Sequence, residues 1–293
     1  MANLKEIRTR IASVKSTQQI TSAMKMVSAA KLRKSQAAIV KLRPYSQKMS
    51  DIMAKVGESM TDEVPFARKP KNKQEKILII ALTSNKGLCS SFNSSIIKLT
   101  AKTIKEYQSA GHSVSVMSYG KKGDSALSKT ENIDYLGTDD MIWEALTFDN
   151  VSKIAERFMN AFLEGKYDRI EIIYNRFKNA ATQIPTIEGF LPVSTRKDGT
   201  STAGNKNRNN DYIFEPGKQE IINSVIPQSL KTQMYKCFLD SFTSEHGARM
   251  SSMNKATDNA QSLLQDLTLT YNKQRQADIT NQIIEVANGA NAV

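Results

Sequence analysis

The first 57 residues are patterned as one long helix. No glycine or proline precedes Pro44, which permits an uninterrupted helix of about 60 Å at 1.5 Å per residue. Apolar residues near the start follow the three-four spacing of a coiled-coil seam, at Leu4, Ile7, Ile11 and Val14. The same register then holds polar residues, at Gln18, Thr21, Lys25 and Ser28, before Leu32, Ile39 and Leu42 restore it. Over that gap a displaced apolar stripe forms at Ile20, Met24 and Val27, so we expect the apolar face to shift around the helix. Pro44 would either kink the helix or end it.

Residues 216–293 predict a second long helix, because no proline follows Pro227 and the only glycines there are Gly217, Gly247 and Gly289. Apolar or small residues lie near coiled-coil spacing at Met253, Ala256, Ala260, Leu263, Leu267, Thr270, Gln274, Ala277 and Ile284. A helix of this kind is marginally stable alone. We therefore expect the two terminal helices to pack on each other, and the periodicity leaves a parallel and an antiparallel arrangement equally open.

Between the terminal helices, residues 76–215 alternate between strand and helix patterns, which predicts an α/β domain with a largely parallel sheet. Strands are expected at 76–84, 113–119 and 169–175, and helices at 93–107 and 151–163. Residues 184–193 and 211–214 are candidates for edge strands. Residues 195–210 are rich in Gly, Ser, Thr, Asn and Lys, which is typical of a surface loop.

Charge is concentrated at one end of the chain. The 293 residues include 41 Lys or Arg against 29 Asp or Glu, a net charge of +12. Twelve bases and two acids fall in residues 1–55, so ten of the net charges lie there. This distribution favours a polyanionic or acidic partner for the first helix. One hypothesis is therefore a basic coiled-coil protein that binds nucleic acid through residues 1–55.

Motifs for catalysis, metals and membrane spans are weak. The nearest approach to a phosphate loop, 199–206, has Asn205 where the motif requires lysine. The Gly120–Gly123 turn could bind an anion, although turn chemistry favours a simple turn followed by a short helix. His112 and His246 have no metal-ligand spacing, Cys89 and Cys237 fit packing roles, and the longest apolar run, 77–82, is too short for a bilayer. We expect no catalytic residue, no metal site and no cofactor.

Motifs near the two ends carry a family resemblance. The sequence from Ile7 to Gln36, IRTRIASVKSTQQITSAMKMVSAAKLRKSQ, resembles the N-terminal helix of the F-type ATP synthase gamma subunit. The sequence from Ser244 to Asn259, SEHGARMSSMNKATDN, is similar to that family's C-terminal signature, and 271–280 continues the match. SNKGLC at 84–89 and FEP at 214–216 fall where the family has its middle markers. Asn85 and Lys86 depart from the Asp-Arg usual there.

The resemblance implies a fold class and a set of partners. It implies an antiparallel coiled coil of a 1–57 helix and a 216–293 helix, with a central Rossmann-like α/β foot domain at 76–215. The coiled coil would rotate inside a ring of alpha and beta subunits, and the foot would stand on the c-ring beside the epsilon subunit. Ion flow would thereby drive ATP synthesis. The protein would be peripheral, at the cytoplasmic face of a bacterial inner membrane, with no nucleic acid as partner.

The resemblance also assigns contact residues. Met24, Lys25, Arg275, Gln276 and Thr280 match family positions that contact a beta subunit. Residues matched to the foot and the c-ring are Arg33, Lys34, Lys41, Arg43, Tyr212 and Glu215. Without the resemblance, we would expect the polar residues to form a solvated face and Met24 to pack in the coiled coil. The basic residues would then form an exposed basic face.

Overall fold

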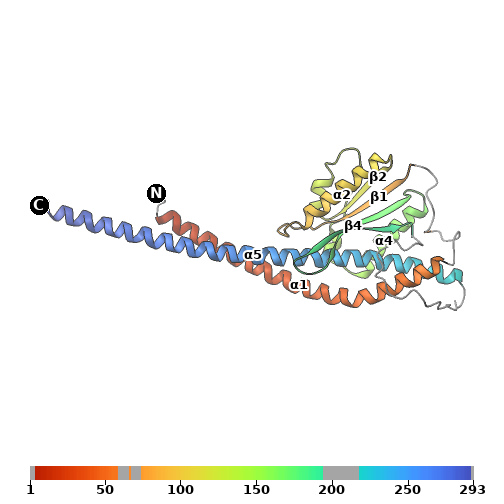
Figure 1. The fold of residues 1–293 in the computed structure, drawn as a ribbon, viewed down its shortest axis with the longest axis horizontal. Helices are drawn as coiled ribbons and strands as arrows, with labels where there is room; N and C mark the ends of the chain where they lie inside the picture. Colours follow the sequence, from red (N-terminus) through yellow and green to blue (C-terminus); the bar gives the residue numbers. More distant parts are fainter. Residues whose placement is uncertain (1–3, 59–65, 67–73, 194–217, 292–293) are drawn as a thin grey trace. The chain divides into compact units, whose positions relative to one another are not determined.

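The computed structural model describes residues 4–58, 66, 74–193 and 218–291 (Figure 1). The chain forms two compact units, one of residues 1–30 and 249–293 and the other of residues 31–248. Two long helices, α1 (Leu4–Glu58) and α5 (Lys218–Asn291), each contribute to both units. Their proline residues, Pro44 and Pro227, lie inside the helices, so α1 does not end at Pro44.

The first unit is a pair of antiparallel helices. The Thr257 hydroxyl donates to the Thr21 hydroxyl over 2.9 Å, and the Gln18 side-chain amide donates to the Gln261 side-chain oxygen. Because the partner on α5 moves from 261 to 257 as α1 advances from 18 to 21, the helices run in opposite directions. These contacts decide the orientation that the periodicity left open, and they confirm the antiparallel coiled coil.

The inward face of α1 keeps one heptad register through its polar stretch. Ile7, Ser28, Leu32 and Ile39 are buried, and Gln18, Thr21 and Lys25 are half-buried. The displaced apolar stripe is instead exposed: Ile20 is 55 %, Met24 40 % and Val27 58 % accessible. The apolar stripe is thus displaced around the helix to its outer face, while the polar side chains keep the seam by hydrogen bonding across it.

The register of α5 differs from the predicted one by a single residue at alternate positions. The half-buried residues after Ala260 are Leu264, Leu267, Tyr271, Gln274 and Asp278. Leu263, Thr270 and Ala277, which the spacing favoured, are exposed. Sequence spacing allows three-four and four-three alternation equally, and the phase of the partner helix selects between them.

The second unit contains a five-stranded sheet in the order β3-β2-β1-β4-β5. Its strands are β1 (Lys76–Leu82), β2 (Ser113–Tyr119), β3 (Asp134–Thr138), β4 (Arg169–Phe177) and β5 (Gln183–Leu191). The first four are parallel, and β5 pairs antiparallel with β4 at an edge. The largely parallel sheet and the edge strand within 184–193 are confirmed.

Helices cover both faces of the sheet. On one face Ile77, Ile79 and Ala81 pack with residues of α2 (Phe92–Ser109) and of α3 (Lys121–Leu127). On the other face Leu78, Ile80 and Leu82 pack with α4 (Phe148–Leu163) and with residues 226–238 of α5. A strand covered on both sides has no solvent face, which explains the continuous apolar run of β1.

Strand β3 was not predicted from the sequence. It is a short edge strand, it alternates between exposed and half-buried residues, and Gly137 within it has φ +97°. A short 3-10 helix, η2 (Met141–Trp143), follows it. The predicted strand at 211–214 and the predicted loop at 195–210 lie outside the described residues.

Candidate partner-binding surfaces

The exposed stripe on α1 lies beside a groove in the helical pair. The groove has a volume of about 550 Å³ and is lined mainly by α1 residues between 18 and 27, with Thr257 from α5. Met26 and Val27 contribute apolar surface, and Met26 is 66 % exposed. A cluster of exposed apolar side chains at a groove is typical of a protein-binding surface. Met24 lies in the stripe, and Lys25 is half-buried at the seam.

The end of α5 extends past the start of α1. The register that pairs 21 with 257 places Leu4 beside about residue 275, so the later turns of α5 lack a described partner helix. All of residues 281–290 are exposed, and Ile283 and Val286 are 63 % and 73 % accessible. This terminal segment can contact a partner along its whole circumference.

The three predicted contact residues on α5 lie where the overhang begins. Arg275, Gln276 and Thr280 are all exposed. The Thr280 hydroxyl donates to the Gln276 backbone oxygen over 2.9 Å, which fixes the threonine rotamer. The Arg275 guanidinium has no carboxylate partner within the described residues, so it can present its donors to a carboxylate or carbonyl of another chain.

Basic residues on α1 within the second unit differ in their surroundings. Arg33, Lys34 and Lys41 are exposed, and the seven-residue spacing of the two lysines places them on one helix face. Arg43 instead bonds within the chain: its Nη2 donates to the Phe177 carbonyl over 3.1 Å. Tyr212 and Glu215 lie outside the described residues.

Arg43 also contacts a buried acid that the sequence analysis did not single out. Its Nη2 lies 3.7 Å from Oδ1 of Asp240 on α5, and Asp240 is only 3 % exposed. Burial raises the pKa of Asp240 to about 6, against the opposing effects of Arg43 and Lys236. An acid directly after Cys237, Phe238 and Leu239 was a signal in the sequence for a buried carboxylate.

One turn farther back on α5, a second ion pair joins the helix to the sheet edge. The Lys236 ammonium lies 3.1 Å and 3.2 Å from the two carboxylate oxygens of Glu188 on β5. The Tyr174 hydroxyl donates to Glu188 over 2.6 Å. Burial alone would raise the pKa of Glu188, but Lys236 and the hydrogen bonds from Tyr174 and Gln233 lower it below its ordinary value.

The family-like loop at 84–89 is closed by contacts within the chain. Cys89 is 2 % exposed and receives a hydrogen bond from the Asn93 amide over 3.2 Å. The Ser244 hydroxyl of α5 donates to the Asn175 carbonyl, and Ala248 packs against Cys89. In open parallel sheets ligands bind where the strand order reverses, here at the carboxyl ends of β1 and β4. Helix α5 fills that place.

The backbone amides of the turn that follows Gly120 are likewise already hydrogen-bonded within the chain. The amide of Gly123 donates to the Thr83 hydroxyl over 2.9 Å, and the amide of Lys122 donates to the Ser84 carbonyl over 3.1 Å. Since these amides already have acceptors, Gly120 serves as a turn that leads into the short helix α3. This arrangement is the simple alternative weighed against an anion site.

Two further features of the described residues bear on function. Within them, no group of three or more His, Cys, Asp or Glu side chains is arranged to hold a metal ion. None of their helices combines the length and the apolar content that spanning a bilayer requires.

Comparison with known proteins gives a consistent result. A family model described as ATP synthase matches residues 3–293. The chain is 52 % identical over its full length to 99 % of the ATP synthase gamma chain of Flavobacterium johnsoniae. It is 38 % identical, over the full length of both chains, to that of Rhodospirillum rubrum. A chain in the Euglena gracilis mitochondrial ATP synthase, in an OSCP/F1/c-ring structure, superimposes with a TM-score of 0.67 at 22 % identity, covering 99 % of this chain and 94 % of that one.

Proposed function

Since the chain belongs to the ATP synthase gamma subunit family, whose members are non-catalytic central-stalk subunits of a rotary complex, we propose that it transmits torque between ion flow and ATP synthesis. In this role the helical pair turns inside a ring of alpha and beta subunits. The family assignment leaves the alternative, a nucleic-acid-binding coiled coil, without support.

The observation that carries the proposal is the polar seam beside an exposed apolar stripe. Thr21, Thr257, Gln18 and Gln261 hold the helices together by hydrogen bonds, while Ile20, Met24 and Val27 face outward. The pair therefore differs strongly from one side to the other. A partner's equilibrium shifts only through contacts that differ between its states. An asymmetric shaft can accordingly hold three equivalent sites in three conformations.

The proposal assigns two contact zones to the beta subunit. Met24 and Lys25 lie on and beside the exposed stripe, at the level of the 550 Å³ groove. Arg275, Gln276 and Thr280 lie at the exposed start of the overhang and form a polar contact that is made and released in each turn. Guanidinium and amide donors suit such a contact because they bind strongly in one geometry and are readily solvated when released.

The remaining partners follow from the family. We infer that the α/β domain is the foot on the c-ring, beside the epsilon subunit, with Arg33, Lys34, Lys41, Tyr212 and Glu215 at that end. Arg43 was assigned to the same surface, and its bonds to Phe177 and Asp240 give it an additional role within the chain. The proposed location is the cytoplasmic face of a bacterial inner membrane, where the protein is held through the complex.

Reconstitution with alpha and beta subunits tests this function. The expected result is a stable complex that hydrolyses ATP, and no hydrolysis by the purified chain alone. Hydrolysis by the chain alone, or tight salt-dependent binding to duplex DNA without assembly, would contradict the rotor function.

The contact at Arg275 is tested separately in membranes that carry the whole complex. Arg275→Ala should lower ATP synthesis about tenfold, because a hydrogen bond to a charged group contributes about 1.5–3 kcal/mol, while assembly is retained. Lys273→Ala is the matched control, since Lys273 is also exposed and lies on the opposite side of the helix. Equal synthesis by the two variants would remove Arg275 from the contact.

A further inference from the structure

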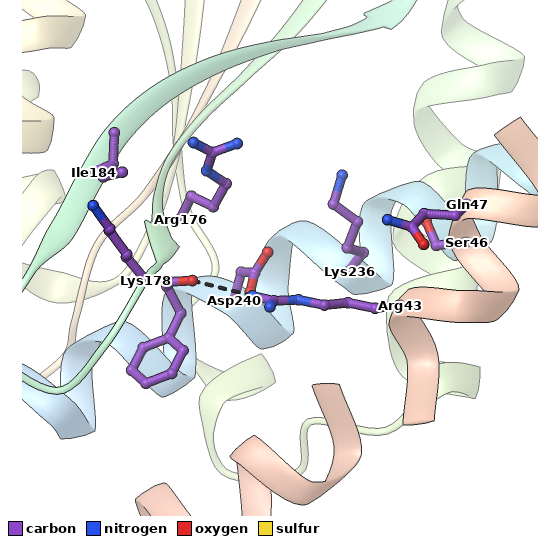
Figure 2. A pocket seen from close by; sticks show the side chains of 9 residues that line it. Arg43, Ser46, Gln47, Arg176, Lys178, Ile184, Lys236 and Asp240 are labelled. Carbon is purple, nitrogen blue, oxygen red and sulfur yellow. Dashed lines mark hydrogen bonds and ion pairs between the residues drawn. The ribbon is translucent and has the colours of Figure 1, made fainter. Parts of the chain in front are cut away.

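A cavity of about 600 Å³ lies in the second unit where α1, the β4–β5 hairpin and α5 converge (Figure 2). Helix α1 contributes Arg43, Ser46 and Gln47, and α5 contributes Lys236 and Asp240. The hairpin contributes the lining residues Arg176, Phe177, Lys178 and Ile184. The volume falls within the roughly 300–1,000 Å³ typical of small-molecule sites.

Positive charge is in excess in this cavity. Four basic side chains, Arg43, Arg176, Lys178 and Lys236, line it together with one carboxylate, Asp240. Even when the Glu188 partner of Lys236 is counted, the basic groups outnumber the acidic groups four to two. Arg176 and Lys178 are exposed and have no carboxylate within ion-pair distance among the described residues. Their charge is therefore available to a ligand.

The geometry of the cavity is set by its own ion pairs. The Arg43 guanidinium is held by the Phe177 carbonyl and by Asp240, and Figure 2 shows Arg43 beside Asp240. Lys236 is held by Glu188. One oxygen of the buried Asp240 carboxylate has no hydrogen bond among the described residues. Cations that are already fixed lose less side-chain entropy when they bind a ligand.

We propose that this cavity binds a small anion that carries two or more phosphate groups, between the hairpin and the two long helices. Arginine forks and lysine ammonium groups are the side chains suited to phosphate oxygens. A single carboxylate would compensate only one of the two available charges, whereas a diphosphate or triphosphate compensates both. Phe177 and Ile184 provide an apolar wall for the rest of the ligand. The site goes beyond the rotor function and involves no chemical step.

Calorimetric titration of the purified full-length chain with tripolyphosphate and with ATP tests the proposal. We expect one site per chain. Arg176→Gln and Lys178→Gln should each weaken binding about tenfold, which corresponds to the loss of one charge-assisted hydrogen bond. Asp240→Asn should tighten binding, because it removes a negative charge that faces the ligand. Lys129→Gln, at an exposed lysine of the same unit, is the control and should leave binding unchanged.

A second experiment, with lipid vesicles, distinguishes the two sources of the phosphate groups, a free anion and a lipid headgroup. Flotation with phosphatidylcholine vesicles, with and without cardiolipin, whose headgroup carries two phosphates, detects a lipid headgroup as ligand. Binding to the anionic vesicles alone, lost in Arg176→Gln and Lys178→Gln, assigns the site to lipid phosphate. Absence of binding in both arms, or equal weakening by Lys129→Gln, overturns the proposal. Unchanged Trp143 fluorescence verifies that each variant is folded.

Discussion

Replacement of the buried Asp240 by asparagine should change the pH dependence of stability in a defined direction. Asp240 is 3 % exposed, and burial raises its pKa from an ordinary 3.8 to about 6. The carboxylate is disfavoured in the fold even though Arg43 lies 3.7 Å away. Asp240→Asn keeps the shape and an oxygen that can accept from Arg43, and it removes the titration.

The size of the effect follows from the two pKa values. A shift of about two units corresponds to about 3 kcal/mol of differential stability. Because the pKa is higher in the folded state, the folded chain binds the proton more tightly than the unfolded chain. The wild type therefore loses stability as the pH rises from about 4 to about 6, and the loss is complete above the folded pKa. Relative to the wild type, Asp240→Asn should gain up to about 3 kcal/mol across that window.

Urea unfolding followed by tryptophan fluorescence measures this difference. The chain's one tryptophan, Trp143, stacks on Phe242, and its ring centroid lies 5.5 Å from that of Phe238. Its fluorescence therefore reports on the core next to Asp240. Unfolding free energies of variant and wild type are compared between about pH 4 and about pH 8. Glu188, whose lowered pKa acts in the opposite direction, is present in both proteins and cancels to first order.

The control is Glu131→Gln, at an exposed carboxylate, which should follow the wild type at every pH. Parallel pH profiles for Asp240→Asn and the wild type would show that the folded state does not raise the pKa of Asp240. The reasoning about its buried ion pair with Arg43 would then be wrong.

Three further outcomes are expected. Gly123→Ala should lower stability by about 1–3 kcal/mol through overpacking. The new Cβ would lie 2.3 Å from the Ser118 hydroxyl and 2.6 Å from the Thr83 hydroxyl. Thermal unfolding measures the loss of stability. Lys25→Glu should change the ratio of ion pumping to ATP hydrolysis in membranes, through charge reversal beside the exposed stripe, whereas an unchanged ratio would count against its contact with beta. Removal of residues 282–293 should leave the thermal stability of the isolated chain unchanged, since residues 282–290 are all exposed; a fall of several degrees would mean that they pack on the chain.

Two of these changes have matched controls. Gly87→Ala should be tolerated, because the nearest atom to its new Cβ is a flexible lysine carbon at 3.7 Å. Lys15→Glu reverses an exposed charge on α1 on the side of the helix away from the stripe and should preserve the pumping ratio. Similar effects in a variant and its control would point to a general loss of folding or charge.

The sheet was readable from the sequence to the extent that its strands are buried. The continuous apolar run of β1 predicted a strand covered on both faces, and Ile77 to Leu82 are all fully buried. Strand β3 has no such pattern, because an edge strand with exposed residues needs little apolar surface. Its existence depends on pairing with β2, which precedes it in the chain on the other side of α3.

The candidate site was readable only where a motif marks it. Arg43 and the residues on the two helices came from the family resemblance, whereas Arg176, Lys178, Lys236 and Asp240 carry no motif. Together with Arg43 they come from α1, the β4–β5 hairpin and α5, which are far apart in the chain. Only the packing of the hairpin and the two helices brings their charges to one cavity.

By itself the sequence determined the helix-forming ends, the buried strands and the concentration of positive charge on α1, because propensity, hydrophobic period and charge are local properties. The tertiary structure decided the antiparallel direction, the phase of the α5 register and the outward position of the apolar stripe. Each of these depends on which side chains meet across two helices. Three-four spacing is compatible with both directions and both phases, and hydrogen bonds such as Thr257 to Thr21 select one of them.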